Sequence, residues 1–571
     1  MLNKPNNKTS NSSSRLSGKV RHFFERSPLY GMTLRKKMPD GLLRVPTDPW
    51  PGDIRTARAL LEGAFPIGHQ MISLNDFLEL LTPQKNGPMT ELDWIHGFDW
   101  LRDLRSICTN SSRKLSRHLM NHWMEHNQSS SSRCWLSASW RPDIMGTRLA
   151  NWVSLFDFFG SSADEDFHRA FMSSLGRQYH HLMRSYADIS DPIRRFRALK
   201  GLIVCACSLY GDSDIILFLL KDLEKTLQKQ VFSDGGHKSR SPVLQLLTVR
   251  DLIDIRSLLR GMNIKEPPFL QAGITAMAPI IRLLRHNDGE MADFGDAQFP
   301  MKNEGGGHYY SSSFIDMVLS LSDVKGRPPG RASDMGFDRL SSKLGTVLIN
   351  TKPLLFNRTN QHDVSSHGEP STNIMNFEWS FGRQRIVHSG DVMVQLSSGL
   401  WIRAEDQDDS NLDLERQTKD GHIYWMGAHN QFFRSQLAPG VGYHHQRQLY
   451  LGSEGGDFRG EDVITLSESG IVALRFVFAE NTQFTQLSNK IIKVSVPPQA
   501  KITKADAKNN NRGCWRLITA GCQEIICQDE GKPEGNEVEK PGASLPTLFL
   551  MAKLKKDKRQ TIKWAFRQET E

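Results

Sequence analysis

The sequence lacks a long apolar run. No stretch of its 571 residues approaches the roughly eighteen consecutive apolar residues that indicate a membrane-spanning helix. The N-terminal segment "MLNKPNNKTSNSSSRLSGK" is polar, and it has no apolar core of the kind found in secretory signals. We therefore expect residues 1–18 to form a flexible tail, and we expect a cytoplasmic protein that does not insert into a membrane.

Cysteine is also scarce. The seven Cys are an odd number, and no two of them form a CxxC pair or a zinc-finger spacing. This pattern excludes a disulfide framework as the basis of the fold. Cys205 and Cys207 lie in the apolar run "GLIVCACSLY", where thiols are ordinary core residues, so a catalytic cysteine is not expected.

Blocks of positive charge are nearly absent, although the net charge is +9. Apart from "KLKKDKRQ" near the C-terminus, Lys and Arg are mixed with Asp and Glu. The sequence contains neither an RNP signature nor a zinc finger, so a nucleic-acid partner is not expected. A positive net charge favours an anionic partner such as an acidic polysaccharide.

The first half of the chain has helical periodicity, from about residue 55 to residue 290. "LDWIHGFDWLRDLRSI" and "RLANWVSLFDFF" place apolar residues at helical spacing, and Ser162 with Glu165 resembles a capping box before the next helix. Such helices must bury their apolar faces against one another. A bundle, a solenoid and a closed toroid all satisfy that requirement.

The second half changes to short strands with a period of two, separated by turn residues. "NFEWSFGRQRIVHSG" predicts two strands around a tight "FG" turn, and "MVLSLSDV", "HIYWMG", "HHQRQLYLG" and "GIVALRFVFA" also have strand character. We therefore predict a helical domain at 19–304 and an antiparallel β domain at 305–571. The boundary falls in the Gly-rich stretch around Gly305–Gly307.

Several longer segments occur in this order along the chain and resemble the bacterial heparinase II/III-like family of polysaccharide lyases. They are "SPLYGMTLRKKMPDGLLRVPTDPWPGD", "IHGFDWLRDLRSI", "RLANWVSLFDFF", "FSDGGHKSRSP", "LLRHNDGEMADFGDA", "DVKGRPPGRASDMGFDRL", "FEWSFGRQRIVHSGD" and "HHQRQLYLGSEGGDFRGED". The resemblance covers roughly Arg21 to Phe566. It implies an α+β multidomain protein, with an N-terminal α/α toroid (an incomplete helical barrel) followed by a C-terminal antiparallel β-sandwich.

The resemblance also implies β-elimination on an acidic, uronate-containing glycan. The proton beside a carboxylate is barely acidic, so the carboxylate must be neutralised by Asn, His, Arg or a metal. A Tyr or His then removes the proton, and a second group protonates the leaving oxygen. No cofactor is required for this chemistry.

Two loops carry most of the candidate residues. "SDGGHKSRSP" offers His237 as an acid/base group, with Lys238 and Arg240 as substrate-binding cations, although it also reads as a turn between helices. "LLRHNDGEMADFGDA" adds His286 as a catalytic candidate, and Arg285 and Asp288 as substrate contacts; a polar Asp-Gly turn is the alternative interpretation.

Asn151 in "RLANW" is the candidate that would neutralise the substrate carboxylate; the alternative is a buried, hydrogen-bonded Asn in a helix. The resemblance also has departures. Ser371 stands where relatives carry a His, no Tyr follows "DGGH", and His308, Tyr309 and Tyr310 match no motif of the family.

A metal site is a further hypothesis. His388 stands about where metal-binding relatives carry an Asp, and His429 with His445 (or its neighbour His444) would complete a set of imidazole ligands for a structural Zn²⁺ or Ca²⁺. No tight spacing links these residues, and histidines on strands are more often structural.

Two other functions remain open. A non-catalytic member of the family would bind an acidic glycan without cleaving it. A glycoside hydrolase on the same toroid would need two carboxylates, for which Asp234, Asp288 and Asp293 are the supply. Family members often act in the cell envelope, so the periplasm is the alternative location. The sequence leaves the glycan, its linkage and the oligomeric state open.

Overall fold

The computed structural model describes most of the chain. The described residues are 30, 33–34, 38–67, 70–83, 89–127, 137–294, 311–352, 374–399, 401–403, 412–433, 441–497, 513–528 and 545–569. Gly305–Gly307, His308, Tyr309, Tyr310, Ser371 and residues 1–18, which the sequence singled out, lie outside them.

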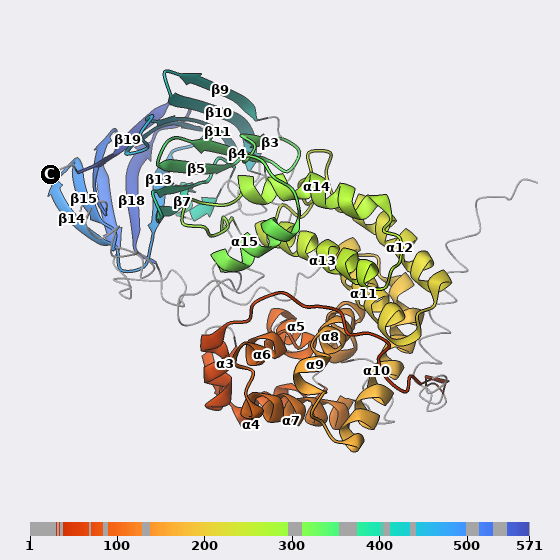
Figure 1. Ribbon diagram of the computed structural model, residues 1–571. Helices are drawn as coiled ribbons and strands as arrows, with labels where there is room; N and C mark the ends of the chain where they lie inside the picture. Colours follow the sequence, from red (N-terminus) through yellow and green to blue (C-terminus); the bar gives the residue numbers. More distant parts are fainter. Residues whose placement is uncertain are drawn as a thin grey trace, which may run out of the picture. The chain divides into compact units, whose positions relative to one another are not determined.

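Helices predominate from residue 54 to residue 321 (Figure 1). The periodicity predicts them up to about residue 290. They are α3 (Ile54–Leu61), α4 (Leu74–Leu80), α5 (Met89–Gly97), α6 (Trp100–Ile107), α7 (Asn110–Asn127), α8 (Pro142–Ser154), α9 (Phe156–Phe159), α10 (Glu165–Ser185), α11 (Pro192–Cys205), α12 (Ser213–Gln228), α13 (Pro242–Gly261), α14 (Pro268–Leu283) and α15 (Ser312–Leu321). A short hairpin of β1 (Ala64–Ile67) and β2 (Gln70–Ser73) separates α3 from α4.

Local capping explains where several of these helices begin. The side chain of Ser73 and that of Asp76 form a capping box at the start of α4. At α10 the capping residue is Asp164, whose carboxylate accepts a hydrogen bond from the backbone N–H of Phe167. The capping box that the sequence suggested, with Ser162 as the cap, is therefore wrong by two residues.

One predicted strand is in fact a helix. The segment "MVLSLSDV" lies largely within α15, where Ser311 caps the first turn through the N–H of Phe314. Phe314, Ile315 and Val318 are buried on one face of this helix. Their spacing is helical, but the alternation of Ser with Leu and Val also fits a strand, and this caused the error.

Helices α8 and α11 pack at very close range through two glycines. A Cβ atom added to Gly146 would lie 2.4 Å from the carbonyl oxygen of Arg197, and one added to Gly201 would lie 2.3 Å from the carbonyl oxygen of Gly146. Only glycine lets the two backbones approach this closely, so the pair fixes how these helices meet.

Antiparallel strands make up most of the described chain after α15. They are β3 (Arg331–Ala332), β4 (Phe337–Ser341), β5 (Gly345–Asn350), β6 (Phe377–Phe381), β7 (Gln384–Gln395), β8 (Trp401–Arg403), β9 (Asp413–Lys419), β10 (His422–Phe433), β11 (Val441–Leu451), β12 (Asp457–Leu466), β13 (Gly470–Phe478), β14 (Gln483–Ser488), β15 (Ile491–Ser495), β16 (Cys514–Ala520), β17 (Glu524–Gln528), β18 (Thr547–Leu554) and β19 (Gln560–Gln568).

These strands form two large sheets. An eight-stranded sheet has the order β14-β15-β16-β19-β12-β11-β10-β9. A nine-stranded sheet has the order β17-β18-β13-β7-β6-β5-β4-β3, with β8 beside β7. Apolar side chains from both sheets, among them Trp379, Trp515 and Trp564, form one buried core between them. This is a β-sandwich.

Strand β12 shows how the sequence produces the sandwich. Its ten residues alternate strictly between partly exposed and buried. In contrast, all five residues of β6 are buried, so the nine-stranded sheet is covered on both faces at this point.

Contacts divide the chain into two compact units. The first contains the chain up to Gln230 together with Arg250–Gly273, and the second contains Val231–Val249, Ile274–Met301 and the chain from Gly307 onwards. We call the second the β unit. Helices α13 and α14 each contribute residues to both units, so part of the helical half of the sequence is built into the β unit.

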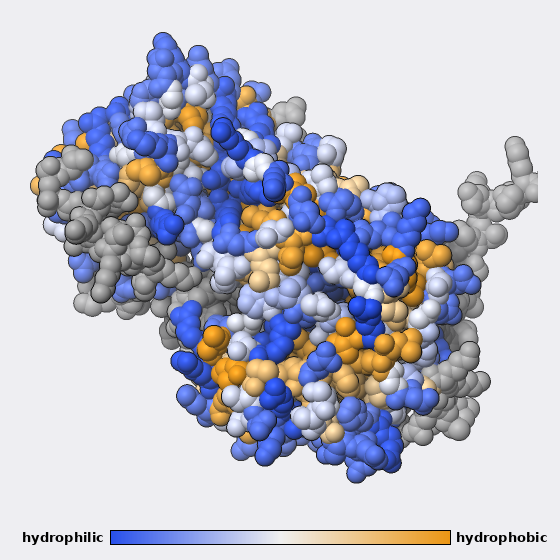
Figure 2. Space-filling model, viewed as in Figure 1, coloured by the Kyte–Doolittle hydropathy of each residue, from blue (hydrophilic) through white to orange (hydrophobic). Residues whose placement is uncertain are grey.

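No helix among the described residues is long and apolar enough to cross a membrane. On the face seen in Figure 2, polar residues predominate over the strands, and apolar residues gather in patches over the helices.

Candidate active site

The hairpin of β6 and β7 supplies the polar side chains of a buried cluster in the β unit. Along β6, Phe377, Trp379 and Phe381 point into the sandwich core. Glu378 and Ser380 therefore lie on the opposite face of the strand. Ser380 pairs with Arg385 of β7 across the hairpin, so three polar residues share one buried face.

A tight loop after α14 packs on this face. The N–H of His286 donates to the carbonyl of Glu290, and the N–H of Gly289 donates to the carbonyl of His286. Gly289 has φ +91°, which favours glycine. The Asp288 carboxylate accepts a hydrogen bond from the N–H of Glu290 at 2.8 Å, so the loop is held from within.

His286 connects the loop to β6 through both ring nitrogens. Its Nε2 lies 2.9 Å from Oε2 of Glu378, and its Nδ1 lies 3.0 Å from Oγ of Ser380. Burial, together with the nearby charges of Arg385 and Arg339, holds the pKa of His286 well below its usual value. The ring is therefore neutral at pH 7, and the Ser380 hydroxyl donates to Nδ1 when Nε2–H donates to Glu378.

Arg385 lies within reach of three carboxylates. Its guanidinium nitrogens are 3.3 Å from Asp288 Oδ2, 3.1 Å from Asp293 Oδ2 and 3.2 Å from Glu378 Oε2. It also donates to the carbonyl of Met291 at 2.9 Å. The Arg385 side chain is only 1% exposed. Burial raises the pKa of Glu378 well above its usual value, while the charge of Arg385 opposes this shift.

His388 and Asp293 form the solvent-facing edge of this cluster. Nδ1 of His388 lies 3.3 Å from Oδ2 of Asp293, and the two side chains are 12% and 28% exposed. The backbone N–H of Asp293 donates to Oε1 of Glu378 at 2.7 Å. This hydrogen bond anchors Asp293 to the buried cluster and so positions its carboxylate beside His388. A carboxylate that orients a partly exposed imidazole can support proton transfer.

The remaining predicted substrate contacts on this loop are engaged in the protein. Arg285 forms an ion pair with Asp316 at 2.6 Å and donates to the carbonyl of Gly289 at 2.8 Å. Asp288 is buried beside Arg385.

Asp234 is the third carboxylate considered for a hydrolase, beside Asp288 and Asp293. It accepts hydrogen bonds from the N–H groups of Gly236, Asp334 and Met335.

The "DGGH" loop also belongs to the β unit. His237 is buried, its N–H donates to Oε1 of Gln245 at 2.6 Å, and its Nδ1 lies 2.6 Å from Oγ of Ser239. Arg240 is buried with φ +59°, whereas Lys238 is exposed. The structure places His237 and His286 in the same unit.

Asn151 lies in the other unit, on α8. Its amide nitrogen donates to the carbonyl of Gly97 at 2.9 Å and to Oδ1 of Asp99 at 3.0 Å, and its oxygen accepts from Arg102 at 3.2 Å. Both amide hydrogens are therefore used within the protein. This is the pattern of the structural alternative that the sequence left open.

The structure does not bring the three predicted metal ligands together. His388 is on β7 of the nine-stranded sheet, beside Asp293, whereas His429 and His445 are cross-strand neighbours in the eight-stranded sheet. In the part of the chain that the structure describes, no three His, Cys, Asp or Glu side chains are grouped so that they could hold a metal ion.

His445 instead belongs to a polar network inside the sandwich. Its Nε2 lies 2.8 Å from Oδ1 of Asp462, which also accepts from Arg447 at 2.6 Å. Arg447 in turn donates to the carbonyls of Met375 and Gly390, both at 2.7 Å. The motif "HHQRQLYLGSEGGDFRGED" thus joins the two sheets.

Sequence reasoning missed the role of Glu378. The signal was present, because Glu378 and Ser380 alternate with three aromatic residues in "FEWSF" and must face away from the core. The sequence did not show that their partners would come from a loop about ninety residues earlier.

Comparison of the sequence with known proteins gives a distant relative but no family. No protein-family model matches the sequence. FtsZ-localized protein C of Caulobacter vibrioides is 24% identical over 305 residues, which are 53% of this chain and 49% of that relative. The match thus spans about half the length of the curated relative.

Solved structures match nearly the whole chain. A crystal structure of heparinase III matches with a TM-score of 0.59 and 11% identity, over 93% of this chain and 86% of that one. A mutant of the heparan sulfate lyase HepC from Pedobacter heparinus matches with a TM-score of 0.51 and 13% identity, over 97% and 89%. The chain therefore has the heparinase III-like fold, and the predicted α/α toroid followed by an antiparallel β-sandwich is confirmed.

Proposed function

Because the chain has the fold of heparinase III, we propose that it is a polysaccharide lyase that cleaves an acidic, uronate-containing glycan by β-elimination. The observation that supports this most directly is the His388–Asp293 pair at the solvent-facing edge of the buried cluster. It provides a partly exposed imidazole that a buried ion-pair network holds in place. The net charge of +9 also suits a polyanionic substrate.

The reaction makes three demands on the protein. The C–H bond beside the uronate carboxylate breaks, its electron pair forms a C=C bond, and the C–O bond to the leaving sugar breaks. One group must take the proton, another must return a proton to the leaving oxygen, and a cation or amide must stabilise the charge on the carboxylate.

We assign proton transfer to His388, with Asp293 as the residue that positions its ring. His286 was the candidate from the sequence, but both its nitrogens are bonded to Glu378 and Ser380 in a buried site. In our proposal His286 therefore holds the loop on β6. His237 remains a candidate for the second proton-transfer group, and its Nδ1 lies 2.6 Å from Oγ of Ser239 in its own loop.

For the substrate carboxylate we propose Lys238 and Arg285. Lys238 is exposed. Arg285 pairs with Asp316, whose side chain is 64% exposed, so a uronate carboxylate can replace that partner without moving a buried group. Exchange of one exposed carboxylate for another costs little, since exposed ion pairs contribute about 0–1 kcal/mol.

The test is an elimination assay. Purified protein is mixed separately with heparan sulfate, chondroitin sulfate, alginate and polygalacturonate, and the ultraviolet absorbance of the new double bond is followed. We expect activity on at least one substrate, and a loss of about 10²–10⁴-fold in kcat for His388→Ala. His126→Ala, which removes an exposed imidazole from α7, is the matched control and should keep full activity.

Two outcomes would contradict the proposal. One is the absence of unsaturated product with every acidic glycan. The other is full elimination activity in a folded His388→Ala variant, which would transfer the role to another residue; His237→Ala then identifies whether that residue is His237.

A non-catalytic glycan-binding protein is the second candidate. Two points favour it: the family resemblance implies a His at the position that Ser371 occupies, and the curated relative is named for its localisation with FtsZ and not for a reaction. Salt-sensitive binding of an acidic glycan without any unsaturated product would select this function over the lyase.

A further inference from the structure

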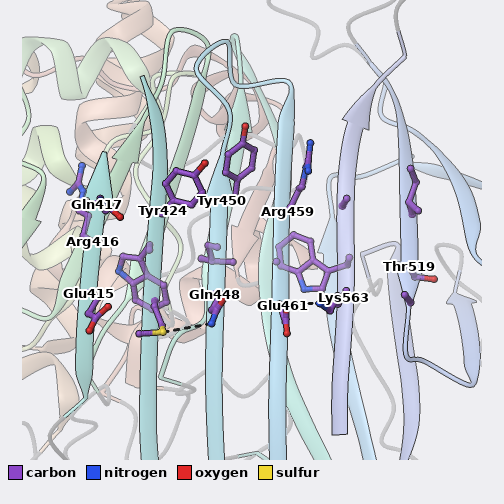
Figure 3. A pocket seen from close by; sticks show the side chains of 18 residues that line it. Glu415, Arg416, Gln417, Tyr424, Gln448, Tyr450, Arg459, Glu461, Thr519 and Lys563 are labelled. Carbon is purple, nitrogen blue, oxygen red and sulfur yellow. Dashed lines mark hydrogen bonds and ion pairs between the residues drawn. The ribbon is translucent and has the colours of Figure 1, made fainter. Parts of the chain in front are cut away.

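A groove lies on the outer face of the eight-stranded sheet, on the side away from the sandwich core. It has a volume of about 1130 Å³ and is lined by residues of β9, β10, β11, β12, β16 and β19 (Figure 3). All its lining residues belong to the β unit. It is separate from the His388–Asp293 pair, which belongs to the nine-stranded sheet and the loop after α14.

Strand register arranges the groove as two parallel rows of side chains. The first row runs across six strands in the order Gln417, Tyr424, Tyr450, Arg459, Ala565, Ile518. The second row runs beside it in the order Glu415, Met426, Gln448, Glu461, Lys563, Ala520. With about 4.8 Å between strands, each row is roughly 24 Å long. The groove therefore suits an extended ligand that lies across the strands.

Two tyrosines form an aromatic platform in the first row. Tyr424 is 44% exposed, and its ring centroid lies 5.2 Å from that of Tyr450. The Tyr450 hydroxyl is held by Nδ1 of His422 at 2.8 Å, and the guanidinium of Arg459 lies over the Tyr450 ring at 5.1 Å. Tyr450 is thus held in place before any ligand binds, which lowers the entropic cost of binding.

The charges around the groove are balanced locally. Lys563 pairs with Glu461 at 2.9 Å, and Arg459 pairs with Asp457. Oδ1 of Asp457 also lies 4.0 Å from Nε of Arg567, and with Glu415 of β9 these groups are three cations and three carboxylates. A polyanion gains no net attraction from such a surface, whereas a neutral ligand finds both hydrogen-bond donors and acceptors.

From these features we propose that the groove binds a neutral glycan chain. A pyranose ring has a face of C–H bonds, which packs on an aromatic ring, and an edge of hydroxyl groups, which bonds to amides, guanidinium groups and carboxylates. Tyr424 and Tyr450 provide the first kind of contact. Gln417, Gln448 and Glu461 provide the second, and the small Ala565 and Ala520 leave room at the far end.

A peptide strand is a poorer occupant for this site. Peptides that extend a sheet pair with the free backbone groups of its edge strand. The groove lies across the face of the sheet: β10, β11, β12, β19 and β16 each pair with a neighbouring strand on both sides, whereas β9 is the edge strand. The glycan is thus the ligand whose chemistry matches the side chains that face outward.

Titration calorimetry tests the proposal on the full chain. The probes are hexasaccharides of β-1,4-linked glucose and of β-1,4-linked N-acetylglucosamine, with a heparan sulfate hexasaccharide as the acidic comparison. We expect at least one neutral hexasaccharide to bind, and Tyr424→Ala and Tyr450→Ala each to weaken its binding about tenfold. Tyr424→Phe keeps the ring and should bind within about twofold of the unchanged protein.

The control is Phe218→Ala, which removes an aromatic side chain that is 58% exposed on α12, outside the β unit, and should leave binding unchanged. Three results would overturn the proposal: no binding of either neutral probe, unchanged binding by the Tyr424→Ala/Tyr450→Ala double variant, or tighter binding of the acidic probe through these tyrosines. The measurement requires no cleavage, so it stands or falls independently of the lyase activity.

Discussion

Arg385 shows at the scale of a single residue how the candidate site is held together. Its guanidinium is almost completely buried and compensates carboxylates from both the loop after α14 and β6. Removal of one partner from a buried ion pair leaves the other charges uncompensated in a medium of low dielectric constant. Removal of Arg385 therefore lowers the free energy of unfolding by more than the lost contacts themselves contribute.

We predict that Arg385→Met destabilises the protein by about 3–5 kcal/mol, because three carboxylates lose their common cation. The measurement is the free energy of unfolding from urea titration, followed by a spectroscopic signal of the β unit. Arg383→Met is the matched control, since Arg383 is exposed in the turn of the same hairpin. A loss below about 1 kcal/mol in Arg385→Met, in the range of surface substitutions, would contradict the argument.

Asp103 on α6 gives a prediction for pH. Burial, with a smaller contribution from the neighbouring Asp53 carboxylate, raises the pKa of Asp103 to about 7, although its carboxylate accepts a hydrogen bond from the N–H of Asp53 at 2.8 Å. The unfolded chain has the ordinary value of 3.8. Between these two values the folded state binds more protons than the unfolded state, so this residue makes stability fall as pH rises from about 4 to 7.

Asp103→Asn should remove that contribution, because the amide does not titrate and its oxygen still accepts the Asp53 hydrogen bond. We expect the variant to gain stability relative to the unchanged protein as pH rises from 4 to 8. The gain should stay below the ~4 kcal/mol that a full shift of this size represents, since part of the side chain contacts solvent. The measurement is the free energy of unfolding of both proteins at several pH values. If the two plots of this free energy against pH are parallel, the pKa of Asp103 is not raised.

At the scale of the element, the sequence correctly predicted helices and hairpins whose formation depends on residues close together along the chain. The spacing of Leu101 and Leu104 indicated a helix, and both are buried on one face of α6. The "FG" turn in "NFEWSFGRQRIVHSG" predicted the hairpin of β6 and β7. These predictions succeed because periodicity and turn chemistry are local properties.

Pairings between distant elements could not be predicted in this way. The "RHNDG" and "FEWS" segments were each recognised as motifs, but their contact joins His286 to Glu378 across 92 residues. Arg447 likewise donates to the carbonyl of Gly390 on the other sheet and to that of Met375, just before β6. Strand alternation shows which side chains face inward, whereas the partner that they meet there depends on the packing of the whole sandwich.

The same limit applies to the candidate site. The sequence singled out the loop after α14, the "DGGH" loop and the hairpin of β6 and β7, and from them it favoured His286 and His237 by residue type. Only the structure shows that His286 is enclosed, while His388 lies at the edge beside Asp293. Burial therefore decides between histidines that the sequence cannot distinguish, because a group that transfers protons to a substrate must be accessible to it.

At the scale of the whole molecule, the β unit contains more than the strands. The segments Val231–Val249 and Ile274–Met301 belong to it by their contacts, although they come from the helical half of the sequence. Asp234 accepts from the N–H groups of Asp334 and Met335, and His286 binds Glu378 and Ser380. One face of the nine-stranded sheet is thus covered by residues that precede Gly305.

We therefore predict that a fragment 307–571 is poorly folded, whereas a fragment 231–571 folds. Without residues 286–293, Glu378 and Arg385 lose their buried partners, and the polar face of β6 is left uncompensated. Circular dichroism and proton NMR dispersion of the two purified fragments give the comparison, and the full chain is the reference. The prediction is wrong if 307–571 unfolds cooperatively at the same denaturant midpoint as 231–571. The loop after α14 would then contribute nothing to the stability of the sandwich.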